Sequence, residues 1–252
     1  MALRLAKVDV GVKVGGEKIN CLMYADDIAI ICEDADDMQI LLNCVSQYGI
    51  DFCLKFSEEK SKVIAVNDDD RDRKWVLGGN EISRVKECKY LGMWVNESGM
   101  DKNKAVKIAK ANQWLGMMNN AARFRANRYE TVRCLWKSLG VPSIMYGAEI
   151  MTWNQSEIDK LEVIQNKVGR VGLGANKFVG IEAIRGEMGW STFEERVSKG
   201  VLKYKARLER MDENRNARKV YSSNYGRGRW ERKCTREASK LQLKSFPDVC
   251  WI

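Results

Sequence analysis

The sequence predicts an α+β protein, with antiparallel hairpins and one packed helix followed by a largely helical region. In the first hundred residues, short β-type runs are separated by Gly-Gly and Asp-containing turns, which is typical of hairpins. From about residue 101, apolar side chains recur at helical spacing instead. The 252 residues, 45% of them hydrophobic, are enough for one large or two small domains with real cores.

The predicted strands follow one another from residue 8 onward. "VDVGVKV" and "KINCLMY" flank Gly15-Gly16 and predict a first hairpin, while "INCLMY" and "IAIIC" predict a second that turns at Ala25-Asp26-Asp27. Two further strands are expected at "DFCLKF" and "KVIAV". "KWVLGGNEISRV" predicts a third hairpin, and "CKYLGMWV" one more strand.

One helix is predicted within this region, over residues 36–48. Acidic residues fill its first turn, Gly49 closes it, and its apolar side chains recur at helical spacing. We expect it to cover one face of a sheet through Leu41, Leu42 and Val45.

Four helices are predicted beyond residue 100. The first, over 101–124, places Ala105, Ile108, Leu115, Met118 and Ala122 on one side. The second, over 128–147, contains Val132, Leu135, Trp136 and Leu139, and Pro142 is expected to bend or interrupt it. The third runs from an N-cap at Ser156 to Val168, and the fourth from a capping box of Ser191 and Glu194 to about Met211. Beyond Glu213 we predict only a basic tail with scattered aromatic residues.

The net charge of +9 is unevenly placed along the chain. Residues 199–240 hold 14 Lys and Arg against five Asp and Glu, an excess that equals the net charge of the whole chain. Residues 24–37 carry six acidic side chains and no basic ones. This layout suits a protein that holds cations in one place and polyanions in another. The predicted segments are therefore 1–100, 101–198 and a basic 199–252.

The basic segment has two readings, a solvated surface or a nucleic-acid contact. Its Lys and Arg are interleaved with Tyr204, Tyr221, Tyr225 and Trp230, which suits phosphate neutralisation with base stacking. Sequence-tolerant contact is expected from Lys203, Lys205, Arg207, Arg215, Arg218, Lys219, Arg227, Arg229, Trp230, Arg232 and Lys233.

Some site and protein classes are disfavoured. The eight cysteines form no CxxC pair and histidine is absent, which indicates reduced thiols in an intracellular protein rather than a zinc site. No apolar run is long enough to span a bilayer, and the N-terminus lacks a signal-peptide pattern. No membrane association is expected.

Asp26 and Asp27 interrupt the apolar stretch "CLMYADDIAIIC". Aspartate is common in turns, so a plain hairpin turn is one explanation. The other is a metal site, because adjacent carboxylates repel each other unless solvent or a cation offsets their charge. The motif alone does not decide between these readings.

Four blocks in order resemble reverse transcriptases, and among them those of non-long-terminal-repeat (LINE-type) retrotransposons. They are "YADD", then "LKFSEEKSKVI", then "KYLGMWV", and later "YGAEIMTW" with "LEVIQNKVGR" and "IRGEMGWSTFEERVSKGVLKYKARLERM". The resemblance covers about residues 10–221. It implies the C-terminal part of a palm in residues 1–100, a helical thumb or connection region in 101–198, and a basic helix and tail in 199–252.

The resemblance also implies roles for individual residues. Asp26 matches the family's metal ligand and Asp27 its neighbour in the catalytic motif, while Lys60 matches a lysine that stabilises the departing pyrophosphate. Tyr90, Leu91 and Gly92 match the strand that grips the primer. The plain alternatives are a solvated lysine at Lys60 and core packing for Tyr90 and Leu91. Ser57 and Glu58 stand where the family has Asn and Pro, a departure from its pattern.

The family further implies Mg²⁺ as cofactor, dNTP as substrate, a template-primer of RNA and DNA as partner, and a nuclear site of action. Two-metal nucleotidyl transfer needs carboxylates that converge from at least two strands. Only Asp9 and Glu17 are acidic before Asp26, and neither lies in a recognisable catalytic block. We therefore expect that the fingers and the first catalytic strand are missing.

Three hypotheses stand. The chain is a truncated reverse transcriptase that is inactive alone, a polymerase whose other half comes from another chain, or a basic nucleic-acid-binding or scaffolding protein derived from a retroelement.

Overall fold

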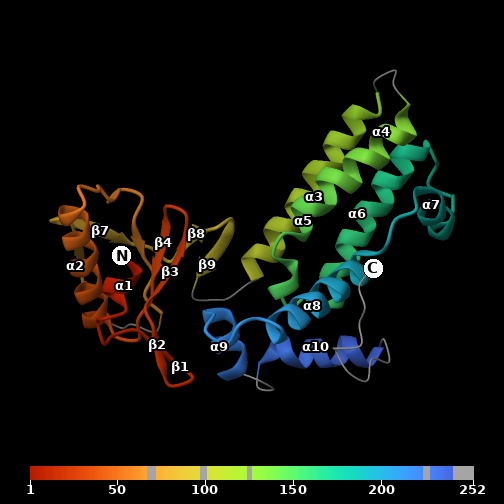
Figure 1. Ribbon diagram of the computed structural model, residues 1–252. Helices are drawn as coiled ribbons and strands as arrows, with labels where there is room; N and C mark the ends of the chain where they lie inside the picture. Colours follow the sequence, from red (N-terminus) through yellow and green to blue (C-terminus); the bar gives the residue numbers. More distant parts are fainter. Residues whose placement is uncertain (67–71, 97–100, 124–126, 224–227, 241–252) are drawn as a thin grey trace. The chain divides into compact units, whose positions relative to one another are not determined.

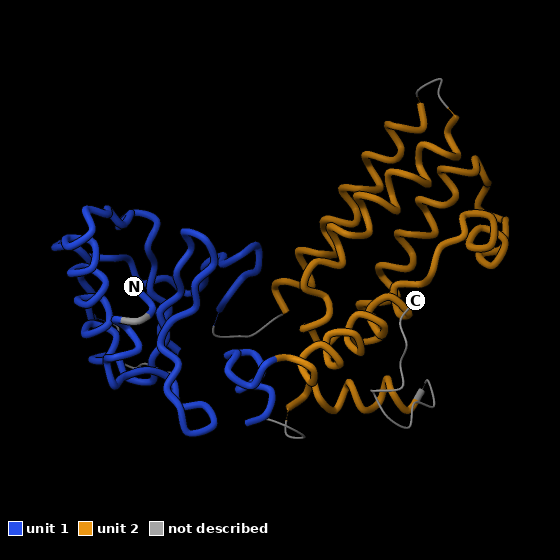
Figure 2. The backbone as a smooth tube through the Cα atoms, in the orientation of Figure 1, with its two compact units in different colours: residues 1–100, 212–224 blue, residues 101–211, 225–252 orange. Residues whose placement is uncertain are grey.

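The computed structural model describes residues 1–66, 72–96, 101–123, 127–223 and 228–240. The chain divides into two compact units, one of residues 1–100 and 212–224 and the other of residues 101–211 and 225–252 (Figure 2). The first unit is built of short sheets and a packed helix, and the second is almost wholly helical (Figure 1). The prediction of an α+β protein is confirmed.

The strands of the first unit form four antiparallel hairpins, β1–β2, β3–β4, β6–β7 and β8–β9, and β5 adds to β7 in parallel. Their bounds are β1 (Val12–Val14), β2 (Glu17–Ile19), β3 (Cys21–Tyr24), β4 (Asp27–Ile30), β5 (Lys62–Val63), β6 (Trp75–Leu77), β7 (Asn80–Arg84), β8 (Glu87–Tyr90) and β9 (Met93–Asn96). The three predicted hairpins are confirmed, and only the first two residues of "KVIAV" form a strand.

Two strand predictions are wrong. "CKYLGMWV" is a hairpin, because Leu91 and Gly92 both take a positive φ, of 46° and 79°, and so close a two-residue turn between β8 and β9. "DFCLKF" is not a strand, because α2 (Ala35–Asp51) runs past Gly49 into this segment. Gly49 does not end the helix. A Cβ on it would lie 2.8 Å from the carbonyl oxygen of Leu54, so its small size admits the returning chain.

Helix α2 supplies the core of the first unit. The Asp34 side chain caps it by accepting from the Asp36 N–H at 2.7 Å, which uses the acidic residues of the first turn as predicted. Its inner face is buried at Leu41, Leu42 and Val45, which confirms that prediction. The core cluster comprises Leu5, Leu41, Leu42, Val45, Val63, Trp75, Leu77 and Ile82. The short helices α1 (Ala2–Leu5) and α9 (Asn216–Ser223) complete this unit.

The second unit contains seven α-helices in its described residues, with one π turn and one 3₁₀ turn. The elements are α3 (Asp101–Ala121), α4 (Arg128–Leu135), the π turn η1 (Trp136–Gly140), α5 (Val141–Met145), the 3₁₀ turn η2 (Ala148–Ile150), α6 (Gln155–Leu173), α7 (Ile181–Met188), α8 (Phe193–Glu209) and α10 (Arg229–Lys240). Helices α7, α9 and α10 were not predicted. The last two lie where only a tail was expected.

The interruption at Pro142 takes the form of the π turn. Proline has no N–H to donate, and ahead of it the Val141 N–H bonds to the Trp136 carbonyl, five residues back. The wider turn changes which side chains face inward. Trp136 is fully buried, whereas Leu139, three residues further along the same segment, is half exposed.

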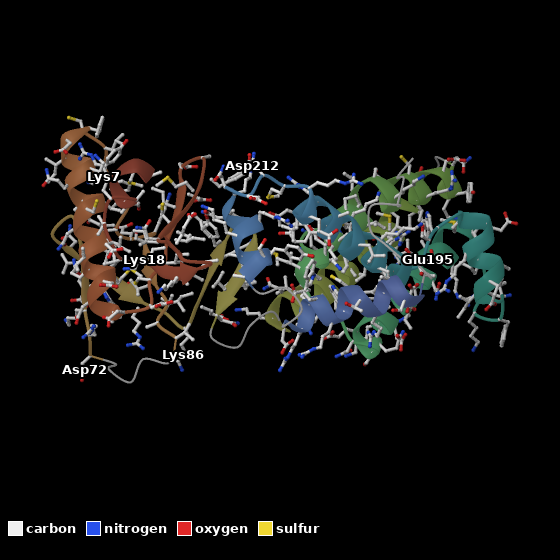
Figure 3. The ribbon with its side chains drawn as sticks, turned by 60° about the horizontal axis from the view of Figure 1, so that its bottom comes forward. Lys7, Lys18, Asp72, Lys86, Glu195 and Asp212 are labelled. Atoms are coloured by element: carbon white, nitrogen blue, oxygen red, sulfur yellow. The ribbon has the colours of Figure 1, made fainter. Side chains whose placement is uncertain are left out.

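Two helix starts differ from the prediction by one or two residues. Asn154 and Glu157 form the capping box of α6, two residues before the predicted cap at Ser156. Thr192 and Glu195 form that of α8, one residue after the predicted pair (Glu195 is labelled in Figure 3). In both cases the observed pair satisfies two backbone N–H groups reciprocally.

The inner face of α3 is more polar than predicted. Ala105 is exposed, whereas Lys104 and Lys107 are buried. The Lys104 ammonium lies 2.7 Å from Asp101 and 2.9 Å from Glu157, so its charge is paired inside the unit. Without those carboxylates, burial of a lysine at this position would be unfavourable.

We predict opposite effects for two glycine-to-alanine changes in helices of the second unit. A Cβ on Gly169 of α6 would lie 2.6 Å from the stiff Ile184 Cγ2 of α7, so Gly169→Ala should lower the free energy of unfolding by about 1–3 kcal/mol. Gly116 of α3 meets nothing within 4 Å, so Gly116→Ala should raise it by about 0.5–1 kcal/mol. Urea unfolding of both variants measures this. Equal effects would contradict the close α6–α7 packing.

Candidate functional site

The β3–β4 hairpin carries Asp26 and Asp27 at its tip. Tyr24 pairs with Asp27 across the two strands, so Ala25 and Asp26 form a two-residue turn and Asp27 begins β4. Both carboxylate side chains are exposed. The four remaining acids of residues 24–37 have other roles. Asp34, Asp36 and Asp37 belong to the start of α2, and Glu33 accepts a hydrogen bond from the Lys13 N–H at 3.2 Å.

This turn differs from the other three two-residue turns in its backbone. The turns at Gly15-Gly16, Gly78-Gly79 and Leu91-Gly92 take a positive φ at both residues, as type I′ turns do. At the β3–β4 tip only Ala25 has a positive φ, of 52°, and Asp26 does not. An alanine in this left-handed region is held at a cost of about 1–2 kcal/mol. Such strain is found at functional sites more often than elsewhere.

Strand β3 exposes its apolar side chains beside the two aspartates. Leu22 and Met23 are each 40% exposed and Tyr24 is 67% exposed. A strand with exposed side chains on both faces is uncommon, because successive residues point to opposite faces and one face is normally buried. The hairpin tip is therefore open to solvent and to any incoming ligand.

Tyr90, at the end of β8, contacts this hairpin from a distant part of the sequence. Its hydroxyl donates to the Leu22 carbonyl of β3 at 3.4 Å. Burial, and then the negative charge of Asp27, raise the pKa of Tyr90. The structure thus brings Tyr90 close to Asp27, a proximity for which the sequence contains no local signal.

The other predicted catalytic and primer-grip residues lie apart from the aspartates or in turns. Lys60 is exposed in the turn before β5, and within the described residues no hydrogen bond or ion pair joins it to Asp26 or Asp27. Leu91 and Gly92 form the tip of the β8–β9 hairpin. Tyr90 is tied to the β3 backbone through the Leu22 carbonyl.

The aspartate pair does not by itself meet the requirements of a two-metal centre. In the described part of the chain, no group of three His, Cys, Asp or Glu side chains is close enough to hold a metal ion. Asp9 and Glu17, the acids before Asp26, are paired with Lys18 (labelled in Figure 3) and with Lys219. Two Mg²⁺ ions need carboxylates from more than one strand, so the described residues around Asp26 and Asp27 do not fit a pair of Mg²⁺ ions.

The predicted nucleic-acid-binding residues divide by exposure and by unit. Lys203, Arg207, Arg215, Arg229 and Arg232 are exposed. Arg215, Arg218 and Lys219 lie in the first unit, where Lys219 pairs with Glu17 and Arg218 lies over the Tyr221 ring. Arg227 lies outside the described residues.

Three of the predicted residues are buried or half-buried within the second unit, namely Lys205, Lys233 and Trp230. Lys205 is buried near Glu209, and burial lowers the pKa of the half-buried Lys233. The Trp230 indole donates to the Glu149 carbonyl at 2.6 Å and packs edge-on against Tyr204, with ring centroids 5.7 Å apart. Lys199 and the C-cap Arg210 were not among the predicted nucleic-acid-binding residues, and both are exposed beside Lys203 and Arg207 of α8.

Comparison with known proteins bears on the first unit. Residues 3–95 match the family described as reverse transcriptase (RNA-dependent DNA polymerase). A comparison with curated proteins gave no match. Part of the chain therefore carries a reverse transcriptase domain, and this part includes the β3–β4 hairpin, Lys60 and Tyr90. Among the described helices of the chain, none has the length and apolar character needed to cross a membrane.

We predict that glycine at position 25 removes the backbone strain of this turn, and that alanine at position 15 introduces similar strain in the β1–β2 turn. Ala25→Gly should raise the free energy of unfolding by up to about 1 kcal/mol, because glycine tolerates the positive φ without a Cβ clash. Gly15→Ala, at the matching position of the β1–β2 turn with a φ of 57°, should lower it by about 1 kcal/mol. Thermal unfolding of both variants checks this. Destabilisation by Ala25→Gly would show that the turn is not strained.

We also predict a small effect of removing the Tyr90 hydroxyl. Tyr90→Phe keeps the ring but loses a long hydrogen bond to the Leu22 carbonyl, so the free energy of unfolding should fall by about 0.5–1.5 kcal/mol. Hydrogen exchange of the β3 and β4 amides should become faster while that of α2 stays unchanged. Unaltered exchange in β3 and β4 would mean that Tyr90 does not anchor the hairpin.

Proposed function

We propose that this chain is the C-terminal portion of an RNA-directed DNA polymerase of a non-long-terminal-repeat retrotransposon. The observation that carries the proposal is the exposed Asp26-Asp27 pair at the tip of a two-residue hairpin turn, within the segment that matches reverse transcriptases. The order of "YADD", "LKFSEEKSKVI" and "KYLGMWV" supports the LINE-type origin. In this proposal residues 1–100 are palm, 101–198 thumb or connection region, and 199–252 a basic segment.

The aspartates are proposed as the part of the catalytic centre that this chain supplies. Rigid strands hold both carboxylates at one tip, which suits ligands for an oxygen-preferring cation such as Mg²⁺. Tyr90 is proposed to position the hairpin through the β3 backbone, and Lys60 to act on the leaving pyrophosphate only when nucleic acid and nucleotide are bound. Because the pair cannot hold two metal ions, a further carboxylate must come from elsewhere before polymerisation can occur.

The second candidate is a nucleic-acid-binding or scaffolding protein that keeps this fold without the chemistry. It is favoured by the separation of charge between the two units, since the exposed cations of α8 and α10 lie outside the family match. The two candidates differ in whether Asp26 matters for function.

We predict that the purified chain alone does not extend a primer on an RNA template, with either Mg²⁺ or Mn²⁺. The reason is the incomplete set of metal ligands around Asp26 and Asp27. A primer-extension assay with labelled primer measures this. Extension that disappears in Asp26→Ala would contradict the prediction and favour a complete polymerase centre assembled by this chain.

Weak cation binding should nevertheless remain at the hairpin tip. Mn²⁺ at millimolar concentration should broaden the amide resonances of residues 25–28, and Asp26→Asn with Asp27→Asn should abolish this. The matched control changes Asp36 and Asp37, an adjacent pair that begins α2, to Asn. Equal loss in the control would mean that the ion is attracted by the general negative charge of this region and not by the hairpin tip.

A further inference from the structure

A pocket lies in the first unit at the end of α2, the helix labelled in Figure 1. Its volume of about 350 Å³ is within the range of natural small-molecule sites. The wall is formed by the end of α2, by the segment that follows it and by the β6–β7 turn. The lining comprises Ser46, Gly49, Ile50, Cys53, Leu54, Lys55, Phe56, Glu58, Leu77 and Gly78.

Apolar side chains make up much of this lining, and some of them are exposed. Ile50 is 71% exposed and Leu54 is 52% exposed, whereas Leu77 is buried and Phe56 is half-buried. Large apolar side chains exposed beside a hollow are typical of ligand sites. The Phe56 ring adds an aromatic surface, and such a surface attracts organic cations as well as neutral rings.

Backbone contacts hold the sides of the pocket together. The Gly78 N–H of the β6–β7 turn donates to the Ser46 hydroxyl of α2 at 2.9 Å, and that hydroxyl donates to the Leu42 carbonyl at 2.9 Å. The Leu54 N–H donates to the Gly49 carbonyl at 2.8 Å, which folds the next segment back onto the helix. The pocket is therefore formed by the fold itself, before any ligand binds.

Glu58 places one carboxylate in a fixed position at the pocket. Its Oε2 accepts a hydrogen bond from the Asn80 side chain at 2.6 Å, and a Cβ on Gly78 would lie 3.0 Å from its Oε1. The side chain is half-buried, and among the described residues no lysine or arginine forms an ion pair with it. A partly desolvated carboxylate is stabilised by an opposite charge nearby, so this one favours a cationic group in the pocket.

The charged neighbours of Glu58 leave that preference in place. Asp51, the last residue of α2, is paired with Arg4. The last turn of α2 contains no basic residue, so the negative end of the helix dipole is at the pocket. Lys55 belongs to the lining too, but it is exposed, and solvent and salt screen its charge more than that of the half-buried Glu58.

We propose that this pocket binds a small organic cation, an amine with an aromatic or aliphatic body. The apolar wall contacts the body, and Glu58 pairs with the ammonium group. The inference goes beyond the proposed function, because the pocket includes neither Asp26 nor Asp27. Glu58 also stands where the family that the chain resembles has Pro, so the family pattern does not supply this carboxylate.

The test compares three probes that share one body and differ in charge, namely 4-phenylbutylamine, 4-phenylbutanol and 4-phenylbutanoate. Cys53 is exposed and lies in the lining, so a bound probe should slow its alkylation by iodoacetamide. Peptide mass spectrometry of the full chain measures that rate at several probe concentrations. Cys134, which is exposed on α4 of the second unit, is the internal control.

The amine should slow the alkylation of Cys53 and leave that of Cys134 unchanged. Half-saturation should fall in the millimolar range, as is usual for a ligand of this size. The amine should bind about fivefold more tightly than the alcohol, which is the gain expected from one partly exposed ion pair. The carboxylate should bind more weakly than the alcohol, because Glu58 repels it.

Four variants separate the contributions of charge and of the apolar wall. Glu58→Gln should remove the difference between amine and alcohol, and its amide oxygen still accepts from Asn80, so the pocket keeps its shape. The matched control is Glu59→Gln, which changes the net charge equally at an exposed residue outside the lining and should keep the difference. Ile50→Ser should weaken all three probes alike, since it removes exposed apolar wall. Lys55→Gln should not weaken the amine.

Several results would overturn the inference. Equal slowing at Cys53 and Cys134, or none at Cys53 at the solubility limit of the amine, would mean that the probe does not occupy the pocket. An amine that binds no more tightly than the alcohol would leave a purely apolar pocket. Equal losses in Glu58→Gln and Glu59→Gln would indicate attraction by general negative charge.

Tighter binding of the carboxylate, lost in Lys55→Gln, would indicate an anion site and would also contradict the proposal. Primer extension has no part in this test. Failure of the polymerase proposal would therefore leave the result intact, and the absence of amine binding would leave the polymerase proposal intact.

Discussion

The two-residue turn at Ala25 and Asp26 is the constraint on which the candidate site depends. Because Tyr24 pairs with Asp27, only two residues connect the strands. Ala25 takes a left-handed φ of 52° to close so short a turn. The strain is offset by the strand pairing on both sides and by the Tyr90 contact with β3. A longer or looser turn would carry the same two aspartates without holding them in fixed directions, and rigid placement is what distinguishes a ligand pair from two solvated acids.

The first unit supports this hairpin through α2 rather than through one continuous sheet. Its strands are short and belong to four small sheets, and two-stranded hairpins are marginally stable alone. The Asp34 cap and the buried face of Leu41, Leu42 and Val45 anchor the helix against Trp75 and Ile82. The acidic residues that form one cluster in the sequence therefore have two different roles in the structure. Asp34, Asp36 and Asp37 stabilise a helix start, whereas Asp26 and Asp27 are exposed at the hairpin tip, where we propose that they act as ligands.

The second unit separates its charges by burial. Its core accepts ionised groups where each has a partner, as with Lys104 between Asp101 and Glu157, and Arg185 beside Glu162 at 3.0 Å. The carboxylates of α10 are buried in the same way. Because those acids are buried, the excess positive charge of this region lies on the exposed sides of α8 and α10, where it can act on a polyanion.

The sequence by itself determined the α+β class, the Gly-Gly hairpins, the inner face of α2 and the aspartate-bearing turn. Each follows from local periodicity or from a residue whose backbone preference is strong. It did not determine the β8–β9 hairpin, because Leu91 is an unusual residue at a positive φ, nor the end of α2, because Gly49 makes room for Leu54 instead of ending the helix. Only the tertiary structure decided that Tyr90 lies near Asp27, that Trp230 packs on Tyr204, and that Lys203 of α8 is exposed while Lys205 is buried. The physical reason is that contacts between distant segments, and the burial they cause, depend on which faces meet, and local pattern carries no information about that.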